Sequence, residues 1–232
     1  MLKTEGRLES SAVVANNAMN RERRLTGANS YRRELGFDPC DLLLGRLAER
    51  GRAAWLDLCC GEGNALIEAA GRLAGTAPGG AASLVGVDLV GRIGGAAGKL
   101  PPGLELVTAS LADWSPSSAK FDLVTCVHGL HYVGDKLGLL ARAAGWLTED
   151  GLFLADFDPA SIRAADGSVL SRPVSRALRR AGADYDSRRH RVGWRGPIPL
   201  EFDGARFLGA DDAAGPSYTG QPGVASYYEW GG

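Results

Sequence analysis

The sequence predicts an α/β fold in which helices cover both faces of a parallel, doubly wound sheet. Two observations carry this prediction. Five short apolar segments alternate with helical patterns, which is the order typical of parallel sheets, and the first of them leads into a glycine-rich turn followed by a helix. The chain has 232 residues, of which 45% are hydrophobic, so it can bury a core of the size this fold needs.

Composition argues against several classes of partner. A formal net charge of -1 gives no basic surface for nucleic acid or for an anionic membrane. No apolar run approaches 18 residues and no signal-peptide pattern is present, so we expect a cytoplasmic protein without a membrane partner. The cysteines Cys40, Cys59, Cys60 and Cys126 show no C-x-x-C spacing, which fits a reduced protein without a metal site.

Residues 1–50 are polar and are expected to form helices that cap the sheet. Leu25-Thr26-Gly27 indicates a break, after which Asn29 or Ser30 would cap a second helix. Phe37-Asp38-Pro39 indicates another helix start, because proline is tolerated in the first turn of a helix.

The first strand and its turn form the central motif. The apolar run 53–56 leads into the turn 57–63, and a helix with an apolar stripe follows. Gly61 and Gly63 let the backbone approach a ligand that a Cβ atom would push away. The free N–H groups at the start of the helix would point at the polar groups of that ligand.

Four further strands are expected at 83–89, 104–108, 121–127 and 151–156. The third of these is a continuous apolar run, as in strands buried on both faces of a sheet.

The rest of the chain supplies connecting and terminal elements. Helical spacing runs from Val133 to Leu147, and Glu149-Asp150-Gly151 indicates a turn after it. A helix is expected near 172–182. Residues 188–195 and 198–208 then indicate an antiparallel pair joined at Gly196-Pro197.

The glycine spacing separates this chain from the dinucleotide-binding pattern, since Leu66 stands where G-x-G-x-x-G needs its third glycine. This spacing argues against a nicotinamide oxidoreductase, which stays as an alternative function. Over roughly residues 50–160 the chain resembles the class I S-adenosylmethionine-dependent methyltransferases. The resemblance rests on Asp57-x-Cys59-x-Gly61-x-Gly63, on Asp88 ending the second strand, and on Phe121-Asp122-Leu123-Val124 with its histidine-rich exit.

This resemblance implies a single domain over residues 1–232, with a Rossmann-like, doubly wound, mostly parallel seven-stranded sheet and a C-terminal antiparallel hairpin. Within it, residues 1–50 would be the N-terminal helical cap, residues 51–160 the cofactor-binding core, and residues 161–232 the C-terminal hairpin and tail.

The resemblance also implies S-adenosylmethionine as the cofactor. The glycine-rich turn would hold its methionine part, and Asp88 would accept both ribose hydroxyls. Ser110-Leu111 would flank the adenine, with Asp113 a rival for its amine, and Tyr31 would reach the cofactor's carboxylate. The predicted cofactor-binding residues are Asp57, Cys59, Gly61, Gly63, Asp88, Leu89, Ser110, Leu111, Asp113, Val127 and Tyr31.

Cys59 departs from the family pattern, because the first motif glycine of the family is a cysteine here. A cysteine has a Cβ atom, so we expect that the turn does not need a positive φ at this position.

His131 and His128 are the candidate catalytic residues. An imidazole can take a proton from a hydroxyl, phenol or activated carbon at neutral pH. We expect His131 to be the better general base, because it lies one turn further from the strand, nearer the entering acceptor. The two residues are three positions apart, so if a helix begins there they share a face and compete for one role. His190 is a weaker candidate.

The acceptor is expected to be a small molecule. Family members that methylate amines of nucleic acid bases or glutamine carry Asn/Asp-Pro-Pro-Tyr/Phe after the fourth strand, where this chain has Cys126-Val127-His128-Gly129. The resemblance therefore implies a methyltransferase of small metabolites, in secondary metabolism such as antibiotic biosynthesis. A cofactor-binding protein that transfers no methyl group, and a noncatalytic partner subunit, stay as alternatives.

The two ends of the chain are expected to form the acceptor pocket. Ligands of open α/β sheets bind outside the carboxyl ends of the strands, and only the N-terminal helices and the aromatic tail lie outside the shared core. The tyrosines expected there are Tyr31, Tyr218, Tyr227 and Tyr228.

Overall fold

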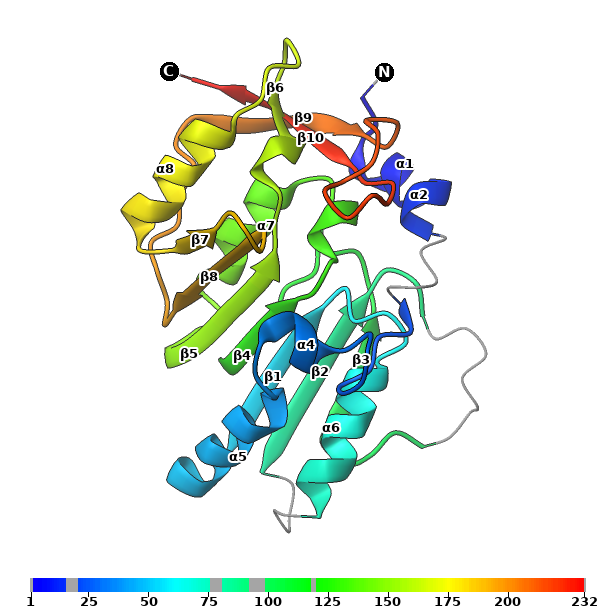
Figure 1. Cartoon of the computed structure of the whole chain (residues 1–232), viewed down its shortest axis with the longest axis vertical. Helices are drawn as coiled ribbons and strands as arrows, with labels where there is room; N and C mark the ends of the chain where they lie inside the picture. The colour runs from blue at the N-terminus through cyan, green and yellow to red at the C-terminus, as the bar shows by residue number, and fades with distance from the viewer. Residues whose placement is uncertain (1, 16–20, 76–80, 92–98, 118–119, 232) are drawn as a thin grey trace.

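The computed structural model describes residues 2–15, 21–75, 81–91, 99–117 and 120–231, and a seven-stranded sheet forms its centre (Figure 1). The strand order is β3-β2-β1-β4-β5-β8-β7, and β8 is antiparallel to both of its neighbours. The predicted mostly parallel, doubly wound sheet is thus confirmed. Its strands are β1 (Ala53–Leu58), β2 (Ala82–Asp88), β3 (Leu104–Thr108), β4 (Phe121–Cys126), β5 (Leu147–Asp156), β7 (Asp184–Asp186) and β8 (Arg191–Arg195).

Helices cover both faces of this sheet, because neighbouring strand residues point to opposite sides. Trp55 of β1 packs in one apolar cluster with α4, α5 and α6, whereas Leu56 packs in a second cluster with α7 and α8. The helices are α4 (Tyr31–Leu35), α5 (Pro39–Arg50), α6 (Asn64–Ala74), α7 (Lys136–Ala143) and α8 (Ser171–Ala181), with the short 3-10 turns η1 (Leu130–Tyr132) and η2 (Pro159–Ser161).

Two predicted helix starts are confirmed by their caps. The Ser30 hydroxyl accepts a hydrogen bond from the N–H of Arg33 at the start of α4. The Asp38 carboxylate accepts from the N–H of Cys40 at the start of α5. Each cap supplies a partner for an N–H that the helix itself leaves unpaired.

The sequence did not predict a second, three-stranded sheet. Part of the N-terminal helical cap packs on this second sheet. Its order is β6-β10-β9, and Lys3 pairs with Ala210 at its edge. Leu8 packs there, so residues 1–50 cover two sheets: the first helices lie on β9, and α4 and α5 on the main sheet (Figure 1). Residues 16–20 of the predicted cap lie outside the described residues. The elements are α1 (Glu5–Glu9), α2 (Ala12–Ala15), β6 (Ile162–Ala164), β9 (Ala205–Asp211) and β10 (Ala225–Trp230).

The predicted pairing of residues 188–195 with 198–208 is wrong. β8 pairs with β5 and β7, whereas β9 pairs with β10 in the other sheet. The hairpin turn lies earlier, where the Asp186 carboxylate accepts from the N–H groups of Arg188 and Arg189. The N–H of Gly196 donates to the carbonyl of Gly151 in the middle of β5, which keeps the chain beside β5 after β8 ends.

The predicted boundary between helix and strand before β5 is also wrong. α7 ends at Ala143, and β5 begins at Leu147, four residues before the expected turn ends. Phe121 pairs with Leu147 but Leu123 pairs with Leu152, so extra residues of β5 are accommodated as a bulge. Within the described part of the chain, no helix has the length and apolar composition of a membrane span.

Candidate active site

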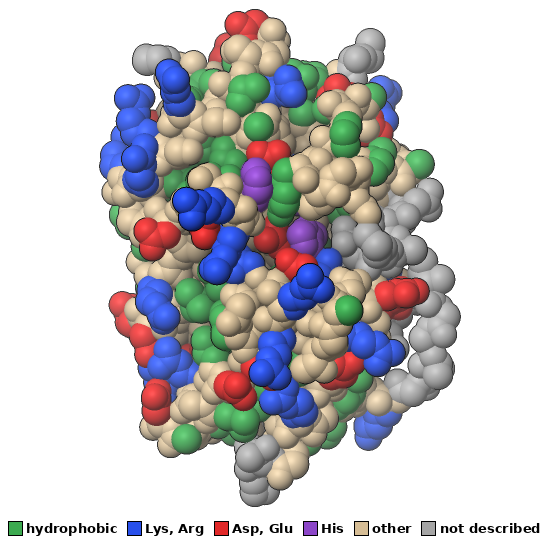
Figure 2. Space-filling model, in the orientation of Figure 1, with side chains coloured by type: hydrophobic (Ala, Val, Ile, Leu, Met, Phe, Trp, Pro, Cys, Tyr) green, Lys and Arg blue, Asp and Glu red, His purple; other side chains and the backbone are tan. Residues whose placement is uncertain are grey.

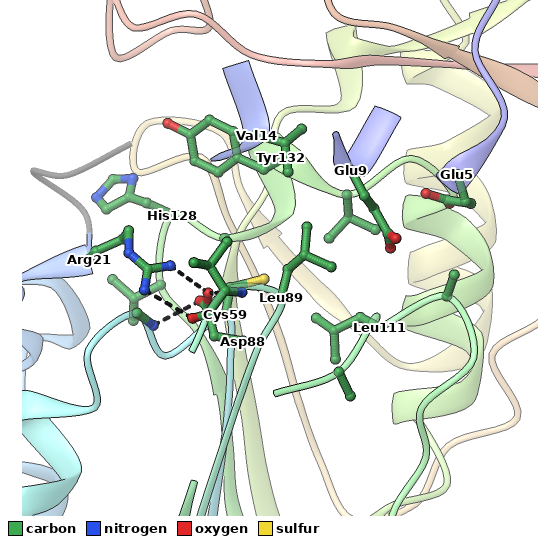
Figure 3. Close-up of a pocket in the computed structure, with 17 residues that line it drawn as sticks. Glu5, Glu9, Val14, Arg21, Cys59, Asp88, Leu89, Leu111, His128 and Tyr132 are labelled. Carbon is green, nitrogen blue, oxygen red and sulfur yellow. Dashed lines mark hydrogen bonds and ion pairs between the residues drawn. The ribbon is translucent and has the colours of Figure 1, made fainter. Parts of the chain in front are cut away.

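A cavity of about 740 Å³ opens at the carboxyl ends of β1, β2 and β4 (Figure 3). The chain leaves β1 towards β2 and β3 and returns to β4, so the cavity lies at the switch point where open α/β sheets bind ligands. α1 and α2 cover it, through side chains such as Glu9 and Val14.

The turn after β1 has left-handed backbone at Cys59, where φ is +57°. The expectation that this position avoids a positive φ is therefore wrong. Left-handed backbone costs an L-residue about 1–2 kcal/mol, and such strain persists only where surrounding structure holds it. A Cβ atom at Gly129 would approach the Cβ of Cys59 to 2.3 Å, so the turns after β1 and β4 interlock through this glycine.

The two predicted glycines of the turn have a positive φ, but protein groups approach them. A Cβ atom on Gly61 would lie 2.5 Å from the backbone of Arg21, and one on Gly63 would lie 2.8 Å from the Leu106 side chain. The N–H of Glu62 also donates to the carbonyl of Arg21 at 2.8 Å. The glycines thus let the segment at residue 21 lie directly on the turn.

Asp88 lies at the end of β2, where the sequence placed it, with its carboxylate in the cavity wall. It accepts hydrogen bonds from the N–H groups of Gly61 (2.9 Å) and Val90 (3.1 Å). Arg21 adds a third bond at 2.8 Å from Nη1 to Oδ1 (Figure 3). Burial raises the pKa of Asp88, and these three donors oppose that rise.

Arg21 is a site residue that sequence reasoning missed. Its guanidinium also donates to Glu62 at 3.2 Å and to the carbonyls of Val90 and Gly91 at 2.9 and 3.0 Å. It therefore joins the turn after β1 to the loop after β2. Nothing in the sequence distinguishes it from the neighbouring arginines at 23 and 24.

These residues fit the ribose of S-adenosylmethionine. An ionised carboxylate offers about four lone-pair positions, and three of those on Asp88 are used by Arg21, Gly61 and Val90. Among the described residues nothing occupies the fourth position, which is open to a ribose hydroxyl, and a second position opens when Arg21 withdraws. Arg21 is thus a competitor for the acid that would hold the ribose.

Asp57 and Tyr31 meet beneath the turn and do not line the cavity. The Tyr31 hydroxyl donates to Asp57 at 2.5 Å, and Thr125 donates to the other carboxylate oxygen at 2.6 Å. Burial raises the pKa of Asp57 to about 7. The Tyr31 hydroxyl is committed to Asp57, so in this arrangement the pair supports the turn from below.

The structure brings together only part of the remaining predicted cofactor-binding residues. Leu89, Leu111 and Val127 line the cavity. The Ser110 hydroxyl donates to Glu9 of α1, an acid that the sequence did not single out. Asp113 is exposed and does not line the cavity.

His128, not His131, lies in the cavity wall. Its Nε2 atom is 3.4 Å from Glu34 and 3.9 Å from Asp156, and its backbone N–H donates to Asp156 at 3.0 Å. The hydrogen bond to His128 is the largest cause that lowers the pKa of Glu34, to about 2. Figure 2 shows histidines among acidic and basic side chains at the middle of one face. Glu34, on α4, was another residue missed from sequence.

His131 lies in η1 behind His128, and the two rings stack with centroids 5.9 Å apart. No helix joins them, because η1 begins at Leu130 and His128 has a φ of +56°, so the two residues do not share a helical face. Only 4% of His131 is exposed, and burial lowers its pKa to about 3. It lines a different cavity, under the C-terminal tail. The positions therefore favour His128 as the base, reversing the expected order, and the roles themselves stay predictions.

Residues 29–196 match a family model described as a methyltransferase domain. The match covers more than half of the chain, and the protein belongs to this methyltransferase domain family. The family assignment confirms the predicted class, an S-adenosylmethionine-dependent methyltransferase, and the cofactor of that class. No curated protein matches the chain.

Solved structures with a similar fold are methyltransferases bound to the cofactor or its product. The plantazolicin methyltransferase BpumL with S-adenosylhomocysteine is 16% identical, with a TM-score of 0.41 over 54% of this chain and 48% of that chain. Coclaurine N-methyltransferase, bound to N-methylheliamine and S-adenosylhomocysteine, is 13% identical, with a TM-score of 0.42 over 67% and 47%. CalS10 from Micromonospora echinaspora, bound to S-adenosylmethionine, is 20% identical, with a TM-score of 0.34 over 56% and 58%. This chain spans about half the length of these proteins.

Proposed function

We propose that this protein transfers the methyl group of S-adenosylmethionine to a small-molecule metabolite, in a reaction of secondary metabolism such as antibiotic biosynthesis. The observation that carries the proposal is the covered cavity at the switch point of the sheet. Asp88 and the glycine-rich turn form one wall, and His128 forms the other. The solved structures above are similar to this chain in fold alone, so the substrate class rests on the cavity.

The cover of the cavity supports a small acceptor over a macromolecule. α1 and α2 lie over the opening and contribute Glu5, Glu9 and Val14 to its wall. The chain's net charge of -1 also offers little attraction for a nucleic acid. A metabolite can enter such a cavity, whereas a folded polymer would have to displace both helices.

The bound cofactor would supply an electrophilic methyl group on a good leaving group. Asp88 would hold the ribose, and the N–H groups that begin α6 would face polar groups of the cofactor. An acceptor oxygen, nitrogen or activated carbon that took this methyl group would lose a proton, and His128 would accept that proton. Most of the rate enhancement would then come from alignment, with the base contributing about 10²–10⁴-fold.

Glu34 would act as a positioning residue for that base. It lies 3.4 Å from Nε2 of His128, and Arg23 holds its other carboxylate oxygen at 3.1 Å. An acid that fixes an imidazole in this way orients the ring and stabilises its protonated form.

Calorimetry with S-adenosylmethionine and S-adenosylhomocysteine tests the binding site. Asp88→Asn is expected to weaken binding by about 1.5–3 kcal/mol, the value of a hydrogen bond to a charged group. Asp203→Asn, at an exposed acid, is the matched control and should bind normally. Undiminished affinity in Asp88→Asn would contradict the assignment of Asp88.

Two further measurements test the reaction. Thermal shifts should show stabilisation by S-adenosylmethionine and none by NAD, since a ligand that binds the folded state raises its stability. Mass spectrometry of a metabolite collection, incubated with methyl-labelled cofactor, should show a labelled product. Binding without any labelled product would favour the cofactor-binding protein that transfers no methyl group.

A further inference from the structure

A second cavity, of about 510 Å³, lies at the carboxyl ends of β4 and β5 under the C-terminal tail. His131 lines it, and the His131 ring stacks on that of His128, which lines the cofactor cavity. Ser217 and the backbone at 223–225 close it from the tail side. Its polar lining residues are His131, Asp158, Ser161, Arg163 and Ser217.

Two buried nitrogens of this cavity have no hydrogen-bond partner among the described residues. One is Nε2 of His131, a residue that is 4% exposed, and the other is Nε of Arg163. Arg163 makes one bond, from Nη1 to the carbonyl of Gly167 at 3.3 Å, and no described acid lies within ion-pair distance. Buried polar groups in folded proteins normally have partners. Unpartnered groups around a cavity therefore indicate a polar ligand.

The charges of the side chains that line the cavity limit which charged groups the ligand can carry. Arg163 brings one positive charge, and Asp158, whose carboxylate accepts only from the N–H of Ala160 at 2.9 Å among the described residues, brings one negative charge. Burial lowers the pKa of His131 to about 3, so its ring is neutral at neutral pH. A phosphate dianion would leave an excess of negative charge. A carboxylate on the guanidinium with a protonated amine near Asp158 leaves the charges balanced, and a hydroxyl there can still donate a hydrogen bond to Asp158; arginine matches carboxylates in a two-bond geometry.

We propose that this second cavity binds the carboxylate of the methyl acceptor, which is a small carboxylic acid that also carries an amine or a hydroxyl group. The inference rests on the proposed methyl transfer and names its substrate class. Arg163 holds the carboxylate, and the remainder of the acceptor reaches past His131 towards His128 and the cofactor cavity. The tail secures this arrangement, because the Tyr218 ring stacks on His190 at 3.9 Å and meets the edge of His131 at 5.2 Å.

The histidines provide the readout. The chain has three of them, so imidazole NMR gives three signals, and His128→Asn and His190→Asn identify that of His131 by elimination. The probes are 4-hydroxybenzoate, anthranilate and L-tyrosine, each compared with its amide. Arg163→Gln removes the charge and keeps most of the side chain. Arg206→Gln is the matched control, because its side chain is 68% exposed in the same small sheet.

At least one of the acids is expected to shift the His131 signal saturably, with binding weaker by about tenfold or more for its amide and in Arg163→Gln. Arg206→Gln should bind like the wild type. The proposal is overturned if an amide binds as well as its acid, if Arg163→Gln binds normally, or if no acid shifts the signal up to roughly 10 mM.

Calorimetry with S-adenosylhomocysteine separates this proposal from the proposed function. Arg163→Gln should bind it with unchanged affinity, because Arg163 is outside the cofactor cavity. If the wild type did not bind S-adenosylhomocysteine, the proposed function would fail, whereas the NMR comparison of acids and amides would still decide whether the second cavity binds carboxylates.

Discussion

The ion pair between Arg21 and Asp88 should link the stability of the free protein to its affinity for the cofactor. The two side chains are only 12% and 14% exposed. Arg21→Gln therefore leaves a nearly buried carboxylate without its cation, and such a loss costs about 3–5 kcal/mol. Because Gly61 and Val90 still donate to the carboxylate, we expect the lower end, about 3 kcal/mol.

The same substitution should strengthen cofactor binding. The ribose hydroxyls would gain the lone-pair position on Asp88 that Arg21 occupies in the free protein. One hydrogen bond to a charged group is worth about 1.5–3 kcal/mol, which corresponds to roughly tenfold or more in affinity. Asp88→Asn should have the opposite effect on affinity, since the amide accepts less strongly and is neutral.

Urea unfolding of the wild type, both single variants and the double variant measures the coupling, and calorimetry with S-adenosylhomocysteine measures affinity. Arg24→Gln is the control, because its side chain is 71% exposed in its pair with Glu68 and should contribute less than about 1 kcal/mol. If the loss of stability in the double variant equals the sum of the losses in Arg21→Gln and Asp88→Asn within about 0.5 kcal/mol, the two side chains do not form a stabilising pair. Weaker cofactor binding by Arg21→Gln would show that Arg21 contacts the cofactor instead of competing with it.

Three other substitutions test further features of the site. The pKa of Asp57 is raised to about 7 in the folded protein, so the wild type should lose stability as pH rises towards 7. Between pH 5 and pH 7, urea unfolding should show a loss of about 2 kcal/mol in the wild type that is absent in Asp57→Asn. Cys59→Gly should change the free energy of unfolding by less than about 1 kcal/mol, whereas Cys59→Val, branched in a left-handed position, should lose about 2 kcal/mol or more in thermal unfolding. Once an acceptor is known, His128→Asn should lower kcat by about 10²–10⁴-fold while His131→Asn mainly raises KM, and a loss below about tenfold in both variants would mean that neither acts as a base.

The parts of the site that sequence could predict are local in the chain. Gly61 and Gly63 follow a strand and precede a helix, and Asp88 ends the next strand, so each was identified from its immediate neighbours. The caps at Ser30 and Asp38 are likewise decided within three residues. Such features depend on backbone geometry that short segments determine by themselves.

The parts that sequence missed depend on contacts between distant segments. Arg21 meets Asp88 across 67 positions, and Glu34 meets His128 only because α4 lies against the end of β4. The pairing of β8 with β5 was missed for the same reason. An added strand pairs with whichever strand lies at the edge of the assembled sheet, and that edge is not evident from the sequence. Neither composition nor periodicity contains this information.

Cys59, Gly129 and His128 form a ridge in the wall of the cofactor cavity, and the backbone of this ridge is strained. Cys59 and His128 have φ of +57° and +56°, a conformation that neighbouring structure has to hold. His128 is held by Asp156 and Glu34, and Cys59 by its packing against Gly129, where no Cβ atom would fit. Relaxing either turn would therefore move the wall of the cofactor cavity. It follows that substitutions in this ridge, like those at Arg21, should change cofactor affinity, whereas Arg163, in the second cavity, should change acceptor KM without changing cofactor affinity.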